Sequence, residues 1–451
     1  MTISELTGAL TDPDLLASYR RDEADLCEAG TPLAVLRPTS TEDVVRAVKW
    51  AAKFNVPIVP QGARTGLAGG ANAIDGCLVL SMTNMNRILE IDRSNRLAVV
   101  QPGVVNAVLS RAANAEGLRY PPDPGSWETS TIGGNVATNA GGMCCVKYGV
   151  TTEYVLGLEV VLADGRVMRT GRRTPKGVAG YDLTRLFVGS EGTLGIITEI
   201  TLALKPAGSE PLTLVAVFPS TAAAGDAVDR IFTAGLAPSL LELLDQVHLN
   251  AIEDYRPMGL DTSAKAILLA AADADLDAIA AQCQTAGAID IWQATDATEA
   301  AELLQARRVA HPAMEKLAMT MFEHGGLIID DIAVPRTRLA ELLDEIEAIA
   351  LKHGVTVGVV GHAGDGNLHP NIVVDRTDPG SVHKGHLVFD EIMERGLAMG
   401  GTCTGEHGVG LLKRDWLAAE AGPVSIEVQR AIKTALDPAN LLNPGKVFSL
   451  T

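Results

Sequence analysis

The chain has 451 residues, a formal net charge of −18 at pH 7 and a hydrophobic content of 47%. This length exceeds what one hydrophobic core usually organises, so we expect two domains. The acidic balance, with no standout basic cluster, argues against nucleic acid or an anionic membrane surface as the main partner. No stretch reaches the roughly 18 consecutive apolar residues of a membrane span, so no transmembrane segment is expected.

The start of the chain and its cysteines indicate the compartment. Residues 1–7 lack the basic and apolar regions of a secretory signal. The six cysteines are scattered without paired CxxC spacing, which favours small core residues in a reducing environment over a disulfide or zinc framework. We therefore expect a cytoplasmic protein, and peripheral attachment at the inner membrane face is left open.

The first half of the chain predicts a mixture of helices and strands. Ser40, followed three residues later by Asp43, fits a helix-capping box before the apolar stripe of 44–52. Asp164-Gly165 indicates a tight turn, and the pattern breaks at 204–209, which we interpret as a domain boundary. Strands are predicted at 56–60, 78–80, 97–100 and 155–162.

Beyond the boundary, strands alternate with helices, which predicts a sheet with helices packed on it. A strand at 212–218 precedes an alanine-rich helix from about Thr221. Helical patterns at about 296–319, 336–353 and 381–399 alternate with strands near 265–271, 327–334, 355–361 and 368–374.

Three polar, glycine-rich loops stand out in the first half, at 60–72, 121–142 and 189–198. Clustered glycines let successive backbone N–H groups point into one concavity, which can hold a pyrophosphate without basic side chains. Each loop alone is weak evidence, because glycine-rich loops usually serve only as turns. Neither a Walker A loop nor a Rossmann G-x-G-x-x-G is present, which disfavours P-loop hydrolysis and classical NAD binding.

The chain contains a motif with two histidines at 361–371 and, further on, a Glu-His pair between glycines at 404–408. The Gly-Asp-Gly centre can reverse the chain, so a strand ending near His362 would return as a strand carrying His369. Asn371 would share a face with His369, since side chains alternate along a strand. Imidazole and carboxylate groups suit a divalent transition ion, and three protein ligands leave a position open for substrate.

These loops and motifs together resemble a known family. The three loops are similar to the FAD-binding domain of the vanillyl-alcohol oxidase / p-cresol methylhydroxylase (PCMH) superfamily. The motifs at 361–371 and 404–408 resemble its D-2-hydroxyacid dehydrogenase branch, which includes cytochrome-type D-lactate dehydrogenases, the FAD subunit of glycolate oxidase and D-2-hydroxyglutarate dehydrogenase. The resemblance runs from about Leu36 to Val447 and closes with 436–438 and 443–446.

The resemblance implies an α+β fold of two domains. It places an N-terminal extension at 1–30 and a PCMH-type FAD-binding domain at 31–208. A C-terminal FAD-linked oxidase domain at 209–451, an antiparallel sheet with helices, would supply the substrate and metal sites, and its last segment would return to the flavin.

The same resemblance assigns the residues around FAD. All nine histidines lie at or beyond His248, so histidyl attachment within the FAD domain is excluded and dissociable FAD is expected. A thioether from Cys144 or Cys145 remains an alternative. The implied FAD-binding residues are Gln61, Gly62, Ala63, Arg64, Thr65, Gly66, Pro122, Asp123, Thr131, Gly134, Asn135, Asn139, Gly142, Glu191, Gly192, Gly195, Ile197, Asn443 and Lys446.

By resemblance, the metal ligands are His362, His369 and Glu406, and zinc or manganese is the expected ion. His407 falls at the position of the general base, with a fourth ligand or a residue that orients a ligand as alternatives. Asn371 would hydrogen-bond the substrate or orient the metal ligands.

The resemblance also suggests how the substrate is bound. Arg307 matches the family's substrate-binding arginine, although Leu304 replaces a usual Trp nearby. The stretch 328–335 lacks the lysine of the dicarboxylate branch and offers Asp330 and Asp331 instead. This favours D-lactate or glycolate, with D-2-hydroxyglutarate as the alternative.

The implied reaction is oxidation of a D-2-hydroxy acid to the 2-oxo acid by hydride transfer to flavin N5. Electrons would pass on to a quinone, a cytochrome or an electron-transfer flavoprotein. Two other readings stay open: an FAD subunit that is inactive without partner subunits, and a non-catalytic flavin-binding protein. The sequence does not fix the oligomeric state, and a homodimer is compatible with it.

Overall fold

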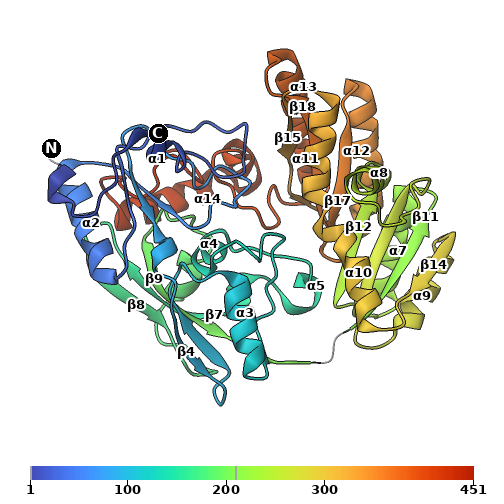
Figure 1. Ribbon diagram of the computed structural model, residues 1–451, viewed down its shortest axis with the longest axis horizontal. Coiled ribbons are helices and arrows are strands. Elements are labelled where there is room, and N and C mark those ends of the chain that lie inside the picture. The colour runs from blue at the N-terminus through green and yellow to red at the C-terminus, as the bar shows by residue number, and fades with distance from the viewer. Residues whose placement is uncertain (1–2, 209–210, 451) are drawn as a thin grey trace. The chain divides into compact units, whose positions relative to one another are not determined.

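The computed structural model describes residues 3–208 and 211–450. The chain divides into two compact units (Figure 1). The first comprises Met1–Gly141, Gly149–Ala207 and Glu406–Thr451, and the second comprises Gly142–Tyr148 and Gly208–Gly405. Both combine helices with sheets, so the predicted α+β class is confirmed.

A small parallel sheet and one long helix begin the first unit. The sheet has the order β1 (Ala34–Leu36), β3 (Leu78–Ser81) and β2 (Ile58–Gln61). Helix α2 (Thr41–Phe54) packs its apolar stripe into the core cluster that also contains these strands. The Ser40 side chain accepts a hydrogen bond from the Asp43 N–H, which confirms the predicted cap.

A five-stranded antiparallel sheet forms the other half of this unit. Gly165, with φ of +81°, makes the predicted tight turn between two of its strands. In order across the sheet, the strands are β4 (Ile88–Asp92), β5 (Leu97–Val100), β9 (Ile196–Ala203), β7 (Val155–Val161) and β8 (Val167–Gly171).

Short helices and one long helix complete the first unit. The long helix α14 (Arg414–Leu436) was not predicted, and its backbone is kinked at Gly422, immediately before Pro423. The other elements are α1 (Pro13–Ala17), α3 (Asn106–Ala115), β6 (Leu118–Arg119), α4 (Ile132–Thr138), α6 (Leu183–Phe187) and β10 (Lys205–Pro206), and β10 pairs with β6.

The second unit is built on one antiparallel sheet. Strand β12, at its centre, was not predicted from the sequence. In order, the strands are β14 (Asp290–Gln293), β11 (Leu212–Phe218), β13 (Ala266–Ala272), β12 (Leu240–Asp245), β17 (Val357–His362), β18 (Asn367–Asp375) and β15 (Gly325–Ile329), and β16 (Ile332–Ala333) also pairs with β18.

Helices pack on this sheet in two groups (Figure 1). One group consists of α7 (Thr221–Thr233), α9 (Leu276–Thr285), α12 (Leu339–His353) and α13 (Pro379–Ala398). The other consists of α8 (Gln246–Tyr255), α10 (Ala297–Arg308) and α11 (Ala310–Met321), and α8 and α11 enclose an apolar core with the strands. The segment α5 (Cys145–Tyr148) also packs within this unit, against β12.

Two predicted elements of this unit were wrong in extent. The helix expected at 296–319 is two helices that meet at Val309, because Pro312 has no N–H to continue the hydrogen-bond ladder to Arg308. The strand expected at 327–334 is interrupted at Asp330 and Asp331, which lie between the end of β15 and the start of β16.

No helix among the described residues is long and apolar enough to cross a membrane. No disulfide joins the six cysteines, all of which lie in the described part of the chain.

Candidate active site

The predicted hairpin is present at the histidine motif. Strand β17 ends at His362, a 3-10 turn covers Ala363–Asp365, and β18 begins at Asn367. Gly366 has φ of +73°, and a Cβ there would lie 2.1 Å from the Val334 carbonyl oxygen. Glycine is therefore required at this point by both the backbone angle and the space.

The strand register brings the two histidines of the motif together on one face. Val360 pairs with His369 across the antiparallel ladder, and His362 lies two residues beyond Val360. The two imidazole rings are 5.1 Å apart between centroids and nearly perpendicular. Val360 belongs to the apolar core under α8 and α11, so the same sheet face changes from apolar to polar at the end of the strand.

Glu242 on β12, which was not predicted as a site residue, contacts His362. Its two carboxylate oxygens accept from His362 Nδ1 at 2.7 and 2.9 Å, and Oε2 also accepts from Arg307 Nε at 2.6 Å. Glu242 is completely buried. Burial by itself would raise the pKa of this carboxyl group, but the charges and hydrogen bonds of His362 and Arg307 outweigh it and lower the pKa.

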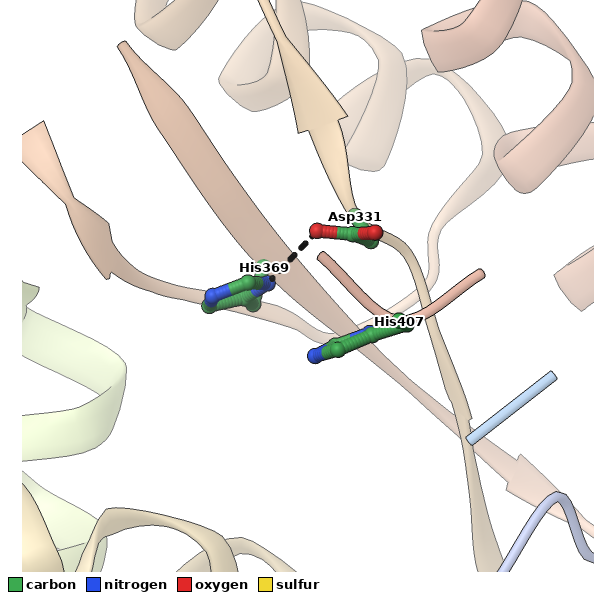
Figure 2. A group of neighbouring side chains, drawn as sticks. All are labelled: Asp331, His369 and His407. Atoms are coloured by element: carbon green, nitrogen blue, oxygen red, sulfur yellow. Dashed lines mark ion pairs between the residues drawn. The ribbon is translucent and has the colours of Figure 1, made fainter. Parts of the chain in front are cut away.

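Asp331 stands in a similar relation to His369. Its Oδ1 lies 3.5 Å from His369 Nδ1 (Figure 2). The carboxylate also accepts from Thr404 Oγ1 at 2.6 Å and from Asn367 Nδ2 at 3.0 Å, and it is completely buried. Each histidine of the motif thus has a buried carboxylate at its Nδ1, which leaves Nε2 as the natural donor to a metal.

The three residues proposed as metal ligands offer their donor atoms close together. One nitrogen each of His362 and His369 and one oxygen of Glu406 all lie within 4.8 Å of one another. A second group, Asp331, His369 and His407, meets the same distance limit (Figure 2). Two imidazoles and a carboxylate fit a divalent transition ion, so the residues present suit the metal that the resemblance implies.

The chain itself delivers Glu406 and His407. They follow Gly405 directly, and the Gly405 N–H donates to the Asp331 carbonyl oxygen at 3.0 Å. A Cβ at Gly405 would lie 2.4 Å from the Asn367 side chain, so this approach requires a glycine. His407 Nε2 and Glu406 Oε1 are 3.9 Å apart.

The other two residues proposed for catalysis lie in the second unit. The Asn371 side-chain amide donates to the His369 carbonyl oxygen at 2.7 Å, so it bonds its own strand. The Arg307 side chain, on α10, is 13% exposed and is held by Glu242 through Nε. Glu242 therefore connects Arg307 to His362.

The first glycine loop of the first unit has the features of an anion-binding nest. The Gln61 side-chain amide donates to Tyr19 O at 2.9 Å and Ala71 O at 2.7 Å, which closes the loop. Arg64 adopts φ of +62°. Within the part of the chain that the structure describes, the N–H groups of residues 63–66 have no hydrogen-bond partner. Such consecutive donors suit a pyrophosphate.

The second glycine loop lies against the first. Thr131 caps α4 by accepting from the Gly134 N–H at 3.3 Å, and a Cβ on Gly62 would lie only 2.3 Å from Thr131 Oγ1. Asn135 is 3% exposed, yet its Nδ2 has no partner among the described residues. A buried unpaired donor beside a nest fits a bound polar cofactor, so the residues present suit FAD.

Three of the proposed flavin residues, Glu191, Asn443 and Lys446, connect the C-terminal segment to these loops. Glu191 accepts from the N–H groups of Val409 and Gly410 at 2.8 and 2.9 Å. The Asn443 amide donates to Gly70 O at 2.9 Å and Glu191 O at 2.7 Å. Burial disfavours the charged form of both side chains. It therefore raises the pKa of the Glu191 carboxyl to about 7 and lowers the pKa of the Lys446 ammonium to about 8.

The remaining proposed flavin residues shape the loops in several ways. Asn139 ends α4 with φ of 55° and accepts from the Thr152 N–H at 2.8 Å. Space requires glycine at 192 and at 195. A Cβ on Gly192 would lie 2.4 Å from the Pro60 side chain, and a Cβ on Gly195 would lie 2.3 Å from the Val160 side chain. Ile197 lies on β9. The carbonyl of Pro122, the residue that precedes Asp123, accepts a hydrogen bond from Asn106 Nδ2. Gly142 has φ of 145°.

Comparisons with known proteins agree with this architecture. Residues 32–171 match the family model described as FAD binding domain, and residues 210–447 match FAD linked oxidases, C-terminal domain. The glycolate oxidase subunit GlcD of Bacillus subtilis is 45% identical over 425 residues, covering 93% of this chain and 89% of that protein. The probable mitochondrial D-lactate dehydrogenase of Danio rerio is 37% identical, covering 96% and 87%.

Solved structures show the same fold. The structure of p-cresol methylhydroxylase with substrate bound is similar with a TM-score of 0.80 and 20% identity, covering 99% of this chain and 96% of that chain. The 4-ethylphenol oxidase from Gulosibacter chungangensis gives a TM-score of 0.79 and 23% identity, with the same coverage. At this identity the likeness establishes the fold alone.

A flavin-binding unit joined to a sheet-based C-terminal unit defines the class as FAD-linked oxidoreductases. The chain belongs to the FAD-linked oxidase family and is an FAD-dependent enzyme, and its fold is that of p-cresol methylhydroxylase.

Proposed function

We propose that this enzyme oxidises a D-2-hydroxy acid to the 2-oxo acid, with D-lactate or glycolate as substrate, using non-covalent FAD and a divalent metal ion. The observation that carries the proposal is the convergence of donor atoms from His362, His369 and Glu406 within 4.8 Å. The similarity to a glycolate oxidase subunit and to D-lactate dehydrogenases supports the same substrate class.

Bound FAD would supply the acceptor for a hydride from the substrate carbon, and a metal ion held by His362, His369 and Glu406 would supply a Lewis acid that lowers the pKa of the substrate hydroxyl. His362 and His369 would hold the ion through Nε2, because their Nδ1 atoms face Glu242 and Asp331. Zinc and manganese both suit this donor set, and Glu406 supplies the negative charge in it.

His407 would accept the hydroxyl proton on a ring nitrogen. An imidazole can take up a proton near neutral pH, and the residue adjoins Glu406 in the chain. Arg307 would bind the substrate carboxylate through its guanidinium group, for which a bidentate pair is the usual geometry. Asn371, bonded to the His369 carbonyl, would stabilise the strand that carries this ligand.

The preference for a monocarboxylate rests on charge. Asp330 and Asp331 are both completely buried, and no lysine occurs between 328 and 335. A second substrate carboxylate near these two acidic side chains would be repelled. D-2-hydroxyglutarate is therefore the alternative substrate rather than the first choice.

A second form of the proposal concerns partners. One relative carries the name of a subunit, GlcD, so this chain would act as the FAD subunit of a larger assembly if it is inactive alone. The proposed acceptors are a quinone, a cytochrome or an electron-transfer flavoprotein, and we propose a cytoplasmic site of action.

The test is dye reduction by the purified chain with D-lactate, L-lactate, glycolate and D-2-hydroxyglutarate. Turnover with D-lactate or glycolate but not L-lactate supports a stand-alone dehydrogenase. Flavin reduction without turnover supports a subunit that needs partners. No flavin reduction by any of the four acids, with FAD and metal bound, overturns the proposed substrate class.

A further inference from the structure

We propose that Glu242 is a positioning residue that couples the metal site to the substrate-carboxylate site. The inference rests on the proposed function, in which His362 binds metal and Arg307 binds substrate. The Glu242 carboxylate contacts both, at 2.7 Å from His362 Nδ1 and 2.6 Å from Arg307 Nε.

The first consequence concerns the histidine tautomer. A carboxylate paired with a guanidinium can only accept hydrogen bonds, and both oxygens of Glu242 lie within 2.9 Å of His362 Nδ1 while Oε2 also accepts from Arg307 Nε. Its bond to His362 therefore places a hydrogen on Nδ1. The Nε2 lone pair is then directed to the metal position, and the ring is held in one orientation.

The second consequence concerns the arginine. Arg307 reaches Glu242 from the last turn of α10, and its side chain is 13% exposed. A planar guanidinium held at Nε cannot rotate freely, so its remaining N–H groups keep one direction. Glu242 thereby fixes the group proposed to bind the substrate carboxylate.

The requirements for this role are specific. Glu242 lies in the apolar run Leu240–Leu244, with no exposed surface, so its charge is costly unless both partners are present. The strand register places Glu242 opposite His362 on the neighbouring strand, because β12 and β17 are antiparallel and Leu243 pairs with Gly361. A shorter acidic residue would not reach both His362 and Arg307. A neutral residue would reach them without the negative charge.

The test compares Glu242→Gln with two reference variants in the FAD-loaded protein stripped of metal. Glu159→Gln is the matched control, because Glu159 is also a buried strand residue, with Arg169 Nη2 at 2.6 Å, in the other unit. Arg307→Ala removes one partner of Glu242 and leaves the other. Calorimetric titration of the metal-free protein with Mn²⁺ or Zn²⁺ gives metal affinity, and steady-state kinetics with D-lactate after the metal is restored gives KM and kcat.

We expect Glu242→Gln to lower metal affinity about 10- to 100-fold and also to raise KM for D-lactate. Arg307→Ala should raise KM without weakening metal binding, and Glu159→Gln should change neither. A circular dichroism spectrum and thermal melt of each variant report folding. A folded Glu242→Gln protein with wild-type metal affinity and KM overturns the inference.

The proposed function fails in a different way. If the wild-type protein binds neither ion and Arg307→Ala leaves KM unchanged, the assignment of the metal and substrate sites is wrong. If wild type binds metal and Arg307→Ala raises KM, the proposed sites stand, and the behaviour of Glu242→Gln alone decides whether Glu242 couples them. Should Glu242→Gln fail to fold, Glu242→Asp, which keeps the charge but shortens the reach, replaces it with the same expected losses.

Discussion

Lys446 donates a hydrogen bond from Nζ to the backbone carbonyl of Asn72 at 2.6 Å, across 374 positions of the sequence. The lysine is 2% exposed and also contacts Asn443 Oδ1 at 3.4 Å. This contact fastens the last segment of the chain to the end of the first glycine loop. The loop that we propose to hold the FAD pyrophosphate is thus stabilised by residues far away in sequence.

Replacing Lys446 with Met should weaken FAD binding. The change removes a charged donor to a buried carbonyl, worth about 1–3 kcal/mol, so a loss of roughly tenfold or more in FAD affinity is expected. Fluorescence titration of the apoprotein with FAD measures this. Lys53→Met, which removes an exposed ion pair with Glu5 and a cation–π contact with Phe54, is the control and should bind FAD normally.

Gly62→Ala should disturb the contact between the first two glycine loops. The new Cβ would lie 2.3 Å from Thr131 Oγ1, so Thr131 must rotate and give up its cap on α4, which costs about 1 kcal/mol. We expect lower thermal stability and weaker FAD retention on gel filtration. Gly125→Ala, where a Cβ meets nothing within 4 Å, should behave as wild type; equal behaviour of both variants would argue against this contact.

His407→Asn should separate binding from chemistry. Asparagine keeps a polar side chain but cannot act as a base, so flavin and metal should remain bound while the rate of flavin reduction falls about 10²- to 10⁴-fold. Stopped-flow absorbance under anaerobic conditions measures the rate. An unchanged rate would remove His407 from the role of general base.

Glu406→Gln should lower the metal content of the purified protein. The amide loses the negative charge that a divalent ion favours in this donor set. Elemental analysis gives the metal-to-protein ratio. Glu427→Gln, an exposed position on α14, serves as control, and identical metal content in the two variants would exclude Glu406 as a ligand.

Asp22 should give the first unit a characteristic pH dependence. Burial raises its pKa from 3.8 to about 6, against the opposing bonds from Ala24 and Ala71. A raised folded-state pKa means that the folded protein binds more protons, so this stabilisation is complete below pH 3.8 and lost as pH rises to about 6. Asp22→Asn should abolish this loss, which amounts to about 3 kcal/mol at most.

The contribution of Asp43 to stability should depend on pH in the opposite direction. Although burial opposes it, hydrogen bonds from Thr39 and the charge of Arg46 lower the pKa of Asp43, so its stabilisation is present at higher pH and is lost on acidification. Urea unfolding of Asp22→Asn and Asp43→Asn between about pH 2 and pH 7 compares the two, because the Asp43 effect is lost below pH 3.8 and the Asp22 effect above it. Parallel pH profiles for both variants would contradict the assignment.

The histidine hairpin could be predicted because its signals are local. The Gly-Asp-Gly turn and the two-residue alternation along a strand are both visible within residues 361–371, and the structure has that hairpin. The capping of α2 by Ser40 was predictable for the same reason. In each case, the residues that determine the conformation are neighbours in the sequence.

The carboxylates behind the histidines could not be predicted in this way. Glu242 is 120 positions from His362, and only the order of strands in the sheet places them together. A single acidic residue inside the run Leu240–Leu244 was the available signal, because charge in a buried strand calls for a partner. The hydrogen bonds of Asn443 and Lys446 to the first glycine loop could not be predicted either, because they join residues more than 370 positions apart.

The central claim is tested most directly by anaerobic loss of oxidised-flavin absorbance on mixing with D-lactate, L-lactate, glycolate and D-2-hydroxyglutarate, before and after chelation. We expect rapid bleaching by D-lactate or glycolate, none by L-lactate, and loss of the reaction in chelator with recovery on adding Mn²⁺ or Zn²⁺. Bleaching that survives complete removal of metal would contradict the metal site, and bleaching by none of the acids would contradict the substrate class.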